Sequence, residues 1–362
     1  MVSCRSGLAT RVMLPESSGR HAAWPWLPDA PPGRASEVGD WPRITVVTPS
    51  LNQGEFIEET IRSVVLQGYP NLEYIIMDGG SDDGTVDIIR RYEKYLADWC
   101  SERDRGQSHA INKGWRRATG EIVAWLNSDD YYVPGTLFRV ASAFSAAGGK
   151  VGMVHARTQV VDRHGTPIGE YGRAFNLVDS LRRSQSGVAQ PSTFVRAECV
   201  RVVGGLAEDL HMAMDWDLWN RLAMETSVSF VPETWSCFRR WQGSKTERDL
   251  SAFGPEQLTS VRRFYQQRTL PRELRAVRGE ALAAAGVAAA ASYCASGRFC
   301  DMRRAFLGAL RNHPTAAVRL AGRNNTRYLA GRMLPGLSRL KQWMIARRRL
   351  FVDWAFGQTR RF

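Results

Sequence analysis

The sequence predicts an α/β protein with a mostly parallel, Rossmann-type sheet flanked by helices and followed by a helical C-terminal extension. Short apolar runs typical of buried strands alternate with segments of helical periodicity over residues 43–133. This alternation favours right-handed βαβ units and a parallel sheet. From Pro255 onward the composition is that of helices.

The first half of the chain sets the order of these elements. Pro49 and Gly54 interrupt the first apolar run, and Gly68 with Pro70 ends the helix after it. The predicted order is a strand over 44–48, a helix over 55–66, a strand over 72–77, a helix over 86–95, a strand over 98–101, a helix over 110–118 and a strand over 121–126.

After Pro134 the predicted elements are shorter and less regular. Met214, Leu218 and Leu222 recur at helical spacing and predict a helix with one apolar face. The other predicted elements are a helix to about 147, strands over 151–155, 158–162, 192–195, 227–231 and 234–239, and a helical hairpin over 281–291 and 303–310.

Charge is distributed unevenly along the chain. The net charge is +13, yet residues 261–362 alone hold 21 Arg and Lys against four Asp and Glu, so the front of the chain is mildly acidic. Six scattered cysteines show neither a disulfide nor a zinc spacing and fit a reduced, cytoplasmic setting. No window has the roughly 20 apolar residues that span a bilayer. A soluble or peripheral protein is expected.

Four polar loops follow the carboxyl ends of predicted strands: residues 49–52, 78–85, 104–107 and 127–130. Ligands of open α/β sheets bind at this edge, so four such loops predict one ligand cleft. Asp129 and Asp130 end a buried run there, and carboxylates suit a hard cation that also binds a diphosphate. Taken alone, the two acids are better explained as a solvated turn after the strand.

The motifs of these loops, taken in order, resemble those of the family 2 glycosyltransferases, which are inverting enzymes of the GT-A fold. The resemblance covers about residues 43–246. It rests on Thr48-Pro-Ser-Leu-Asn52, Asp78-Gly-Gly-Ser-Asp-Asp-Gly-Thr85, Asp104-Arg-Gly-Gln107, Asn127-Ser-Asp-Asp130 and Met214-Asp-Trp-Asp-Leu-Trp219.

Composition and the resemblance together predict three parts: a loose leader over 1–42, a catalytic domain over 43–255 and a basic helical extension over 256–362. The catalytic domain divides into a nucleotide-sugar part over 43–133 and an acceptor part over 134–255. The leader holds Trp24 and Trp26, which could instead anchor it on the domain.

By resemblance, residues of all four loops bind the donor, and Asp129 holds a Mg²⁺ or Mn²⁺ ion. Two departures from the family are Asn127, where an Asp is usual, and Gln242, where a His is common. The residues assigned to the donor are Pro49, Leu51 and Asn52 for the nucleoside, Asp78 for the base edge, Gln107, Asn112 and Lys113 for the ribose and diphosphate, and Asn127 with Ser128.

An inverting transfer needs a general base opposite the leaving group. The resemblance implies Asp215 for this role, with Asp217 as the competing carboxylate. Gln190 and Trp216 are assigned to the acceptor, although Trp216 could also be a core residue.

The implied function is transfer of a sugar from a nucleoside-diphosphate donor to a saccharide or lipid-linked acceptor, in cell-surface polysaccharide or glycolipid assembly. One alternative is a nucleotide-sugar-binding protein with impaired catalysis. The other is a nucleic-acid-binding protein, which is disfavoured because the basic excess lies outside the motif-rich half. Basic and apolar residues over 337–356 predict either a segment that lies on the anionic inner face of a membrane or a helix with a solvated Arg face.

Overall fold

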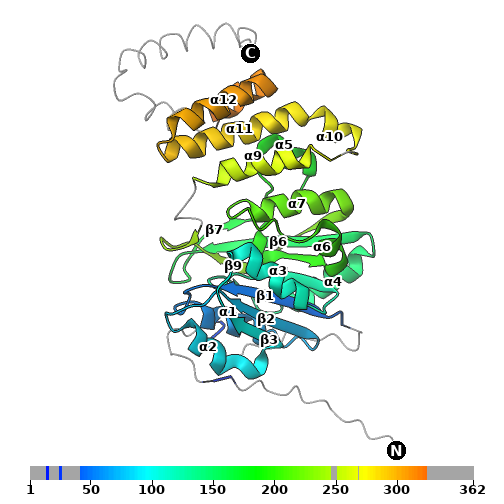
Figure 1. The fold of residues 1–362 in the computed structure, drawn as a ribbon. Coiled ribbons are helices and arrows are strands. Elements are labelled where there is room, and N and C mark those ends of the chain that lie inside the picture. The colour runs from blue at the N-terminus through cyan, green and yellow to red at the C-terminus, as the bar shows by residue number, and fades with distance from the viewer. Residues whose placement is uncertain (1–13, 16–23, 27–40, 246–250, 268, 324–362) are drawn as a thin grey trace, which may run out of the picture. The chain divides into compact units, whose positions relative to one another are not determined.

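The computed structural model describes residues 14–15, 24–26, 41–245, 251–267 and 269–323 (Figure 1). The chain forms two compact units. One comprises Met1–Leu181 with Gln185–Asp249, and the other comprises Arg182–Ser184 with Leu250–Phe362.

The first unit is built on a nine-stranded sheet. Its motif-bearing strands lie together and run parallel: β3 (Asp98–Ser101), β2 (Leu72–Asp78), β1 (Ile44–Ser50) and β4 (Ile122–Trp125). The sheet continues through β8 (Thr193–Arg196), β6 (Val151–Val161), β9 (Ser227–Arg239) and β5 (Tyr131–Tyr132), and β7 (Pro167–Tyr171) pairs with β6. Only β5, β7 and β8 run against the rest, so the prediction of a mostly parallel sheet is confirmed.

The long strand β9 corrects the sequence prediction, which divided it into two strands at Pro232. Along its ladder with β6, Val231 pairs with Ala156 and Thr234 pairs with Arg157. Two residues of β9 are therefore left out of the register, and a bulge of this kind accommodates a proline that has no N–H to donate. The strand continues to Arg239 and delivers the following residues to the edge of the sheet.

Helices pack on the sheet (Figure 1), and alternating strand residues belong to two separate core clusters. Val46 and its neighbours in the first cluster pack against α1 (Ile57–Val65), α2 (Thr85–Tyr92) and α4 (Thr136–Ala147). Val47 and its neighbours pack against α3 (Gln107–Arg117), α6 (Ala197–Val203) and α7 (Met214–Glu225). The remaining helices of this unit are the short η1 (Glu93–Tyr95), η2 (Gln190–Ser192) and α5 (Leu177–Arg183), which runs into the second unit.

Glu73 on β2 links β1 to the loop that precedes β4. Its carboxylate accepts hydrogen bonds from the Thr45 hydroxyl at 2.5 Å and from the amide and hydroxyl of Thr119, both at 2.7 Å. It also pairs with Arg43 at 3.1 Å. Burial disfavours the charged carboxylate, but these bonds outweigh that cost and lower the pKa of Glu73 below its usual range.

Replacing Glu73 with Ala is expected to lower the free energy of unfolding by ~2 kcal/mol, because the buried Thr45 hydroxyl and two partly buried donors of Thr119 lose their acceptor. Because the pKa of Glu73 is lower in the folded state than in the unfolded state, its ionised carboxylate stabilises the fold at pH values above the unfolded-state pKa. That contribution disappears as the pH falls through the folded-state pKa. Denaturant unfolding at pH 7 and at pH 4 measures both effects, and the gap between wild type and variant should narrow at the lower pH. The matched control is Asp87→Ala, whose ion pair with Arg90 is exposed; an equal loss there would contradict the prediction.

Residues 24–26 of the leader contact the unit that contains the sheet. The Trp24 indole donates to the Tyr132 carbonyl at 2.7 Å, and the Arg62 guanidinium donates to the Pro25 carbonyl at 3.2 Å. Trp26 lies under the same guanidinium, 5.4 Å from the ring centroid. These contacts match the alternative in which tryptophans anchor the leader.

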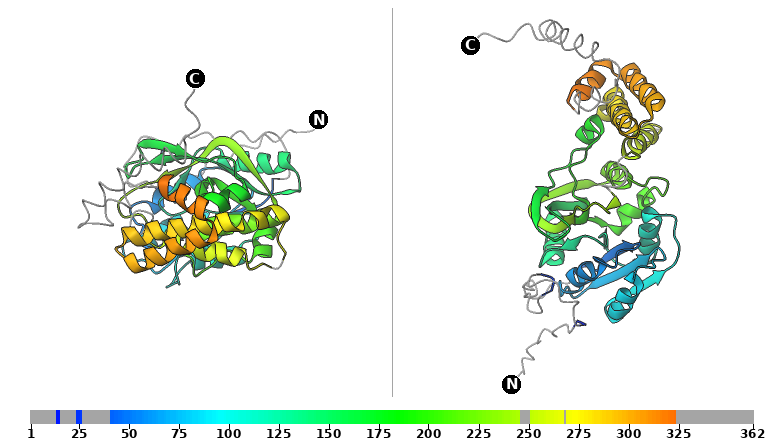
Figure 2. Two further views of the ribbon diagram at one scale, coloured as in Figure 1. Left: turned by 90° about the horizontal axis from the view of Figure 1, so that it is seen from above. Right: turned by 90° about the vertical axis from the view of Figure 1, so that its left-hand side faces the viewer.

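The second unit is helical. Helix α11 (Arg278–Ala295) contacts α9 (Phe253–Phe264), α12 (Phe299–Asn312) and α13 (Pro314–Arg323), as the adjacent yellow and orange helices in Figure 2 show, and α10 (Arg272–Ala276) precedes it. Small side chains such as Ala283 and Ala309 fill the space between these helices. The predicted hairpin is confirmed, with longer helices. The predicted interfacial segment 337–356 lies outside the described residues, and within them no helix has the length and hydrophobicity to cross a bilayer.

Candidate active site

The strands β1, β2 and β3 end in register, with Ser50 opposite Asp78 and Asp78 opposite Ser101. The Gly79 amide donates to the Ser50 carbonyl at 2.8 Å and the Glu102 amide donates to the Asp78 carbonyl at 3.0 Å. The loops that follow these strands therefore lie side by side at one edge of the sheet, as predicted.

At this edge the Asp78 carboxylate is buried and shapes its own loop. It accepts bonds from the amides of Gly80 and Ser81 at 3.0 and 2.9 Å, and from the hydroxyls of Ser81 and Ser101 at 2.5 and 2.6 Å. Its acceptor capacity is largely used by these four donors. The structure thus shows Asp78 as the residue that orders the loop.

Beside that loop, an apolar side chain lies near an accessible carboxylate. Leu51 is 56% exposed, which is unusual for a leucine at the end of a buried strand, whereas Pro49 is buried within β1. Leu51 Cδ1 and Asp104 Oδ2 both border the space above Gly79, where an added Cβ would lie 3.5 and 2.9 Å from them. The sequence motif included Asp104 but gave it no role.

Asn52 holds the first two loops together. The Asn52 backbone amide donates to the Ser81 hydroxyl at 2.8 Å, and the Asn52 side-chain oxygen accepts from the Asp82 backbone amide at 3.0 Å. Its φ of 52° is tolerated by Asn better than by most residues.

The acidic turn after β4 contains two carboxylates in different environments. Asp130 is 1% exposed and accepts bonds from the Arg239 amide at 2.9 Å and the Asn127 side-chain amide at 3.2 Å. Burial, together with the neighbouring charge of Asp129, raises the pKa of Asp130 well above its usual range. Ser128 is buried as well.

Asp129 is only half-buried, so it is the carboxylate of the turn that solvent and ligands can reach. Burial raises its pKa, and a hydrogen bond from the Trp241 indole at 3.0 Å partly offsets that effect. Arg239 fixes the backbone here by donating to the Asp129 carbonyl at 3.0 Å.

A chain of polar side chains crosses the edge of the sheet. Lys245 Nζ donates to Gln107 Oε1 at 2.6 Å, and Gln107 Nε2 donates to Asn127 Oδ1 at 2.7 Å. The Asn127 amide donates onward to Gln190 Oε1 at 3.1 Å, and Gln190 Nε2 donates to the Trp125 carbonyl at 2.8 Å. Gln107, Asn127 and Gln190, each assigned to the site from sequence, are thus brought together.

Asp215 lies in the first turn of α7, where the helix dipole favours a carboxylate. It is half-buried, and its Oδ1 accepts the Trp216 amide at 2.6 Å. Burial raises its pKa, partly countered by that amide and by the positive charge of Lys245. Lys245 also donates a hydrogen bond to Gln107. The same cation therefore acts electrostatically on Asp215 and by a hydrogen bond on the polar chain.

The competing carboxylate has a different environment. Asp217 is buried, and its Oδ2 accepts from Arg221 Nε at 2.7 Å. Arg221 also donates to the carbonyls of Val203 and Gly205 at 2.7 and 2.8 Å, so this pair joins α7 to the loop after α6.

Comparison with known sequences decides the family. A sequence model of Glycosyl transferase family 2 matches residues 45–195. An uncharacterized glycosyltransferase of Mycobacterium tuberculosis is 31% identical over 190 residues, which are 51% of this chain and 70% of that protein. The chain belongs to glycosyl transferase family 2.

Other relatives match over shorter parts. A Bacillus subtilis glycosyltransferase named for teichuronic acid biosynthesis is 43% identical over 97 residues, which are 25% of this chain. This match covers 36% of that protein's length. A separate match to an uncharacterized glycosyltransferase from Nostoc also covers 36% of that protein's length.

Solved structures establish the GT-A-type fold of this family 2 member. Residues 1–349 of Staphylococcus aureus TarS, solved with UDP-GlcNAc, align with a TM-score of 0.52 at 17% identity, over 79% of this chain and 93% of that one. The mannosyltransferase PcManGT from Pyrobaculum calidifontis, solved with GDP-Man and Mn²⁺, aligns with a TM-score of 0.52 at 20% identity, over 81% and 84%.

Within this glycosyltransferase fold, the side chains of two residues assigned to the donor from sequence have partners in the protein itself. Asn112 Nδ2 donates to the Leu206 carbonyl at 2.9 Å, and Asn112 Oδ1 accepts the Leu206 amide at 2.9 Å. Lys113 pairs with Glu102 and contacts the Cys100 sulfur. Helical periodicity explains the difference, because both residues lie beyond the first turn of α3, whereas Gln107 begins it.

The acceptor side also differs from the sequence assignment. Trp216 is 3% exposed, so its ring has little surface available for stacking on a sugar. Tyr171, at the end of β7, is 48% exposed. The pKa of Tyr171 is raised, mainly because its hydroxyl is partly desolvated and also because of the negative charge of the nearby Asp215. Tyr171, Trp241 and Lys245 received no role from the sequence, because their placement depends on pairing between distant strands.

Proposed function

We propose that this protein is an inverting glycosyltransferase that moves a sugar from a nucleoside-diphosphate donor to a hydroxyl of a saccharide or lipid-linked acceptor. One observation carries the proposal. Lys245 connects a half-buried carboxylate, Asp215, with the Gln107–Asn127 pair at the edge where nucleotides bind in such folds.

In the proposed reaction, Asp215 accepts the proton of the acceptor hydroxyl while that oxygen bonds to the anomeric carbon. The bond between the anomeric carbon and the phosphate oxygen breaks on the opposite face, and its electron pair leaves with the nucleoside diphosphate. Lys245 and Gln107 lie where they could bind the departing diphosphate, whose charge grows as the bond breaks. We assign the contact with the base to Leu51 and Asp104, which border the same space above Gly79.

The residues fit a Mg²⁺ or Mn²⁺ ion shared with the donor. Among the described residues no group of three or more His, Cys, Asp or Glu side chains could hold a metal alone. One half-buried carboxylate, that of Asp129, suits an ion that binds one or two carboxylates plus substrate phosphates. When bound, such an ion neutralises charge on the diphosphate.

The names of relatives support the substrate class. TarS and PcManGT were solved with UDP-GlcNAc and GDP-Man, and the Bacillus relative is named for teichuronic acid biosynthesis. We infer a hexosyl donor and a role in cell-surface polysaccharide or glycolipid assembly on the cytoplasmic side of the membrane.

Donor binding and turnover test this proposal. Thermal shift with a panel of UDP- and GDP-sugars plus Mn²⁺ is expected to identify a stabilising donor, and that donor should be slowly hydrolysed to its nucleoside diphosphate. Binding without hydrolysis or transfer would favour the catalytically impaired alternative. Binding of none of these donors would contradict the proposal.

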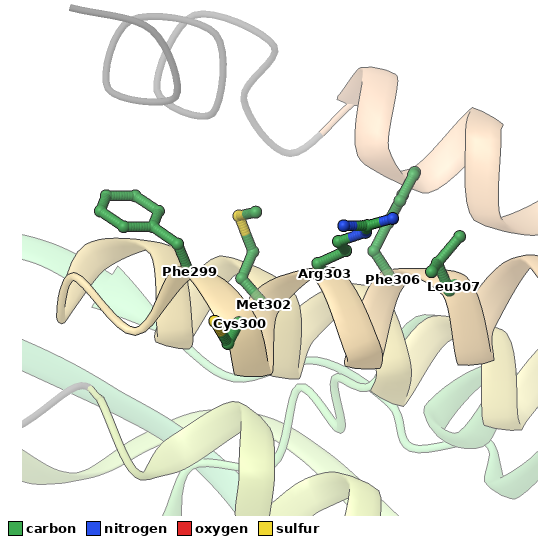
Figure 3. Close-up of a pocket in the computed structure, with 6 residues that line it drawn as sticks. All are labelled: Phe299, Cys300, Met302, Arg303, Phe306 and Leu307. Atoms are coloured by element: carbon green, nitrogen blue, oxygen red, sulfur yellow. The ribbon is translucent and has the colours of Figure 1, made fainter.

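We further infer that the helical unit contacts an anionic membrane. Residues 251–323 hold twelve Arg and four Asp or Glu. On α12, Phe299, Met302, Phe306 and Leu307 project from one side around a shallow groove of about 400 Å³, with Arg303 among them (Figure 3). Phe299 and Leu307 are 48% and 42% exposed. Apolar residues interspersed with arginine suit a surface of anionic lipid.

Vesicle co-sedimentation tests this membrane contact. The full chain is expected to bind phosphatidylglycerol vesicles, and Phe299→Ser with Leu307→Ser should weaken binding about tenfold by removing two apolar anchors. Val202→Ser is the control, because Val202 is exposed on α6 in the other unit. A chain ending at Gly336 measures the contribution of segment 337–356. Equal binding by all variants, or equal binding to neutral vesicles, would exclude this contact.

A further inference from the structure

Trp241 contacts the proposed metal ligand from a distant part of the sequence. Its indole nitrogen donates to Asp129 Oδ2 at 3.0 Å, and the two residues are 112 positions apart. The pairing of β5 with β9, Tyr131 opposite Cys237, brings these segments together.

The Trp241 ring is held on several sides. Phe56 packs against it with ring centroids 5.0 Å apart, and the Arg163 guanidinium lies 5.6 Å from its centroid. Arg163 is itself fixed by a bidentate pair with Glu55, at 2.8 and 2.6 Å. A Cβ on Gly243 would lie 2.0 Å from the ring, so the turn after Trp241 requires glycine.

The rest of the acidic turn is also fixed. Arg239 donates to the Asp129 carbonyl at 3.0 Å and to Glu59 at 2.6 Å, and its own amide donates to Asp130. Once the backbone is held this way, the orientation of Asp129 depends on its side-chain torsions. The indole bond restricts them while leaving the carboxylate further acceptor sites.

We propose that Trp241 is a positioning residue of the donor site, which orients the Asp129 carboxylate toward the cation and diphosphate. The inference rests on the proposed function, since it concerns how the donor's cation is held. Hydrogen bonds to a ligating carboxylate commonly set its metal affinity.

Trp241→Phe tests this role, because it removes the indole donor and keeps an aromatic ring against Phe56. Electron paramagnetic resonance can follow Mn²⁺ binding to the full chain with saturating UDP and, separately, GDP. The dissociation constant of Mn²⁺ is expected to rise about tenfold in the variant. Trp99→Phe is the matched control, since the indole of Trp99 on β3 donates to Glu93 of η1. The Mn²⁺ affinity of this variant should equal that of the wild type.

A double variant separates positioning from general damage. In an Asp129→Asn background, Trp241→Phe should change Mn²⁺-supported donor hydrolysis by less than about twofold, because the carboxylate it orients is absent. Equal Mn²⁺ affinity of wild type and Trp241→Phe, or full additivity in the double variant, would overturn the inference alone. Failure of wild type to bind Mn²⁺ with either nucleotide would overturn the metal part of the proposed function and this inference with it.

Discussion

Asp215→Asn is expected to lower the transfer rate about a thousandfold, because an amide cannot accept the proton of the acceptor hydroxyl. Donor affinity should stay within about twofold, since the role we propose for Asp215 is on the acceptor side and the substitution preserves size. Initial-rate kinetics and donor titration calorimetry separate the two quantities.

The matched control for this substitution is Asp87→Asn, at an exposed carboxylate on α2. It should leave the transfer rate unchanged. A variant Asp215→Asn that retains more than about a tenth of the wild-type rate would show that another group is the base. Asp217 would not be the next choice, because it is buried against Arg221.

The pH dependence of transfer tests the environment of the same carboxylate. Burial raises the pKa of Asp215, with the Trp216 amide and Lys245 opposing that effect. The base acts only when ionised, so the rate should fall as the pH drops through this raised pKa. The acidic limb is therefore expected at higher pH than for an ordinary aspartate. Lys245→Met removes the opposing charge and should move that limb to still higher pH.

Asp129→Asn is expected to weaken Mn²⁺ binding about a hundredfold and to lower metal-supported transfer by a similar factor, because a charged oxygen ligand becomes neutral. Titration with Mn²⁺ at fixed donor concentration measures both, and saturating Mn²⁺ should partly restore the rate. Asp87→Asn again serves as the control. An unchanged Mn²⁺ requirement in Asp129→Asn would place the cation elsewhere.

Replacing the neighbouring carboxylate should give a different result. Asp130 accepts the Arg239 amide and the Asn127 side chain in the interior, so Asp130→Ala should lower the free energy of unfolding by ~3 kcal/mol. Thermal unfolding and Mn²⁺ titration distinguish this loss of stability from the loss of a ligand.

Much of the fold follows from local sequence patterns. Apolar runs and helical periodicity placed β1, β2, β3 and β4 with errors of one or two residues at their ends. The carboxyl ends of parallel strands share an edge, so the clustering of the four loops also followed from sequence. The match of ordered motifs then indicated the family.

Side-chain partners were less predictable, because they depend on which distant segments become neighbours. Asn112 follows Gln107 by five positions on α3 but bonds to Leu206, and the Asp78 carboxylate is occupied by its own loop. Both assignments came from position within a motif, which does not reveal where a side chain points.

The sequence by itself determined the parallel core and the edge at which the four loops meet, and its resemblance to the family pointed to Asp129 rather than Asp130 as the metal ligand. Only the tertiary structure decided what surrounds Asp129. The two-residue strand β5 is too short to show a periodic pattern, yet its pairing with β9 brings Trp241 to Asp129. Short-range periodicity is encoded locally, whereas this contact depends on the strand order of the whole sheet.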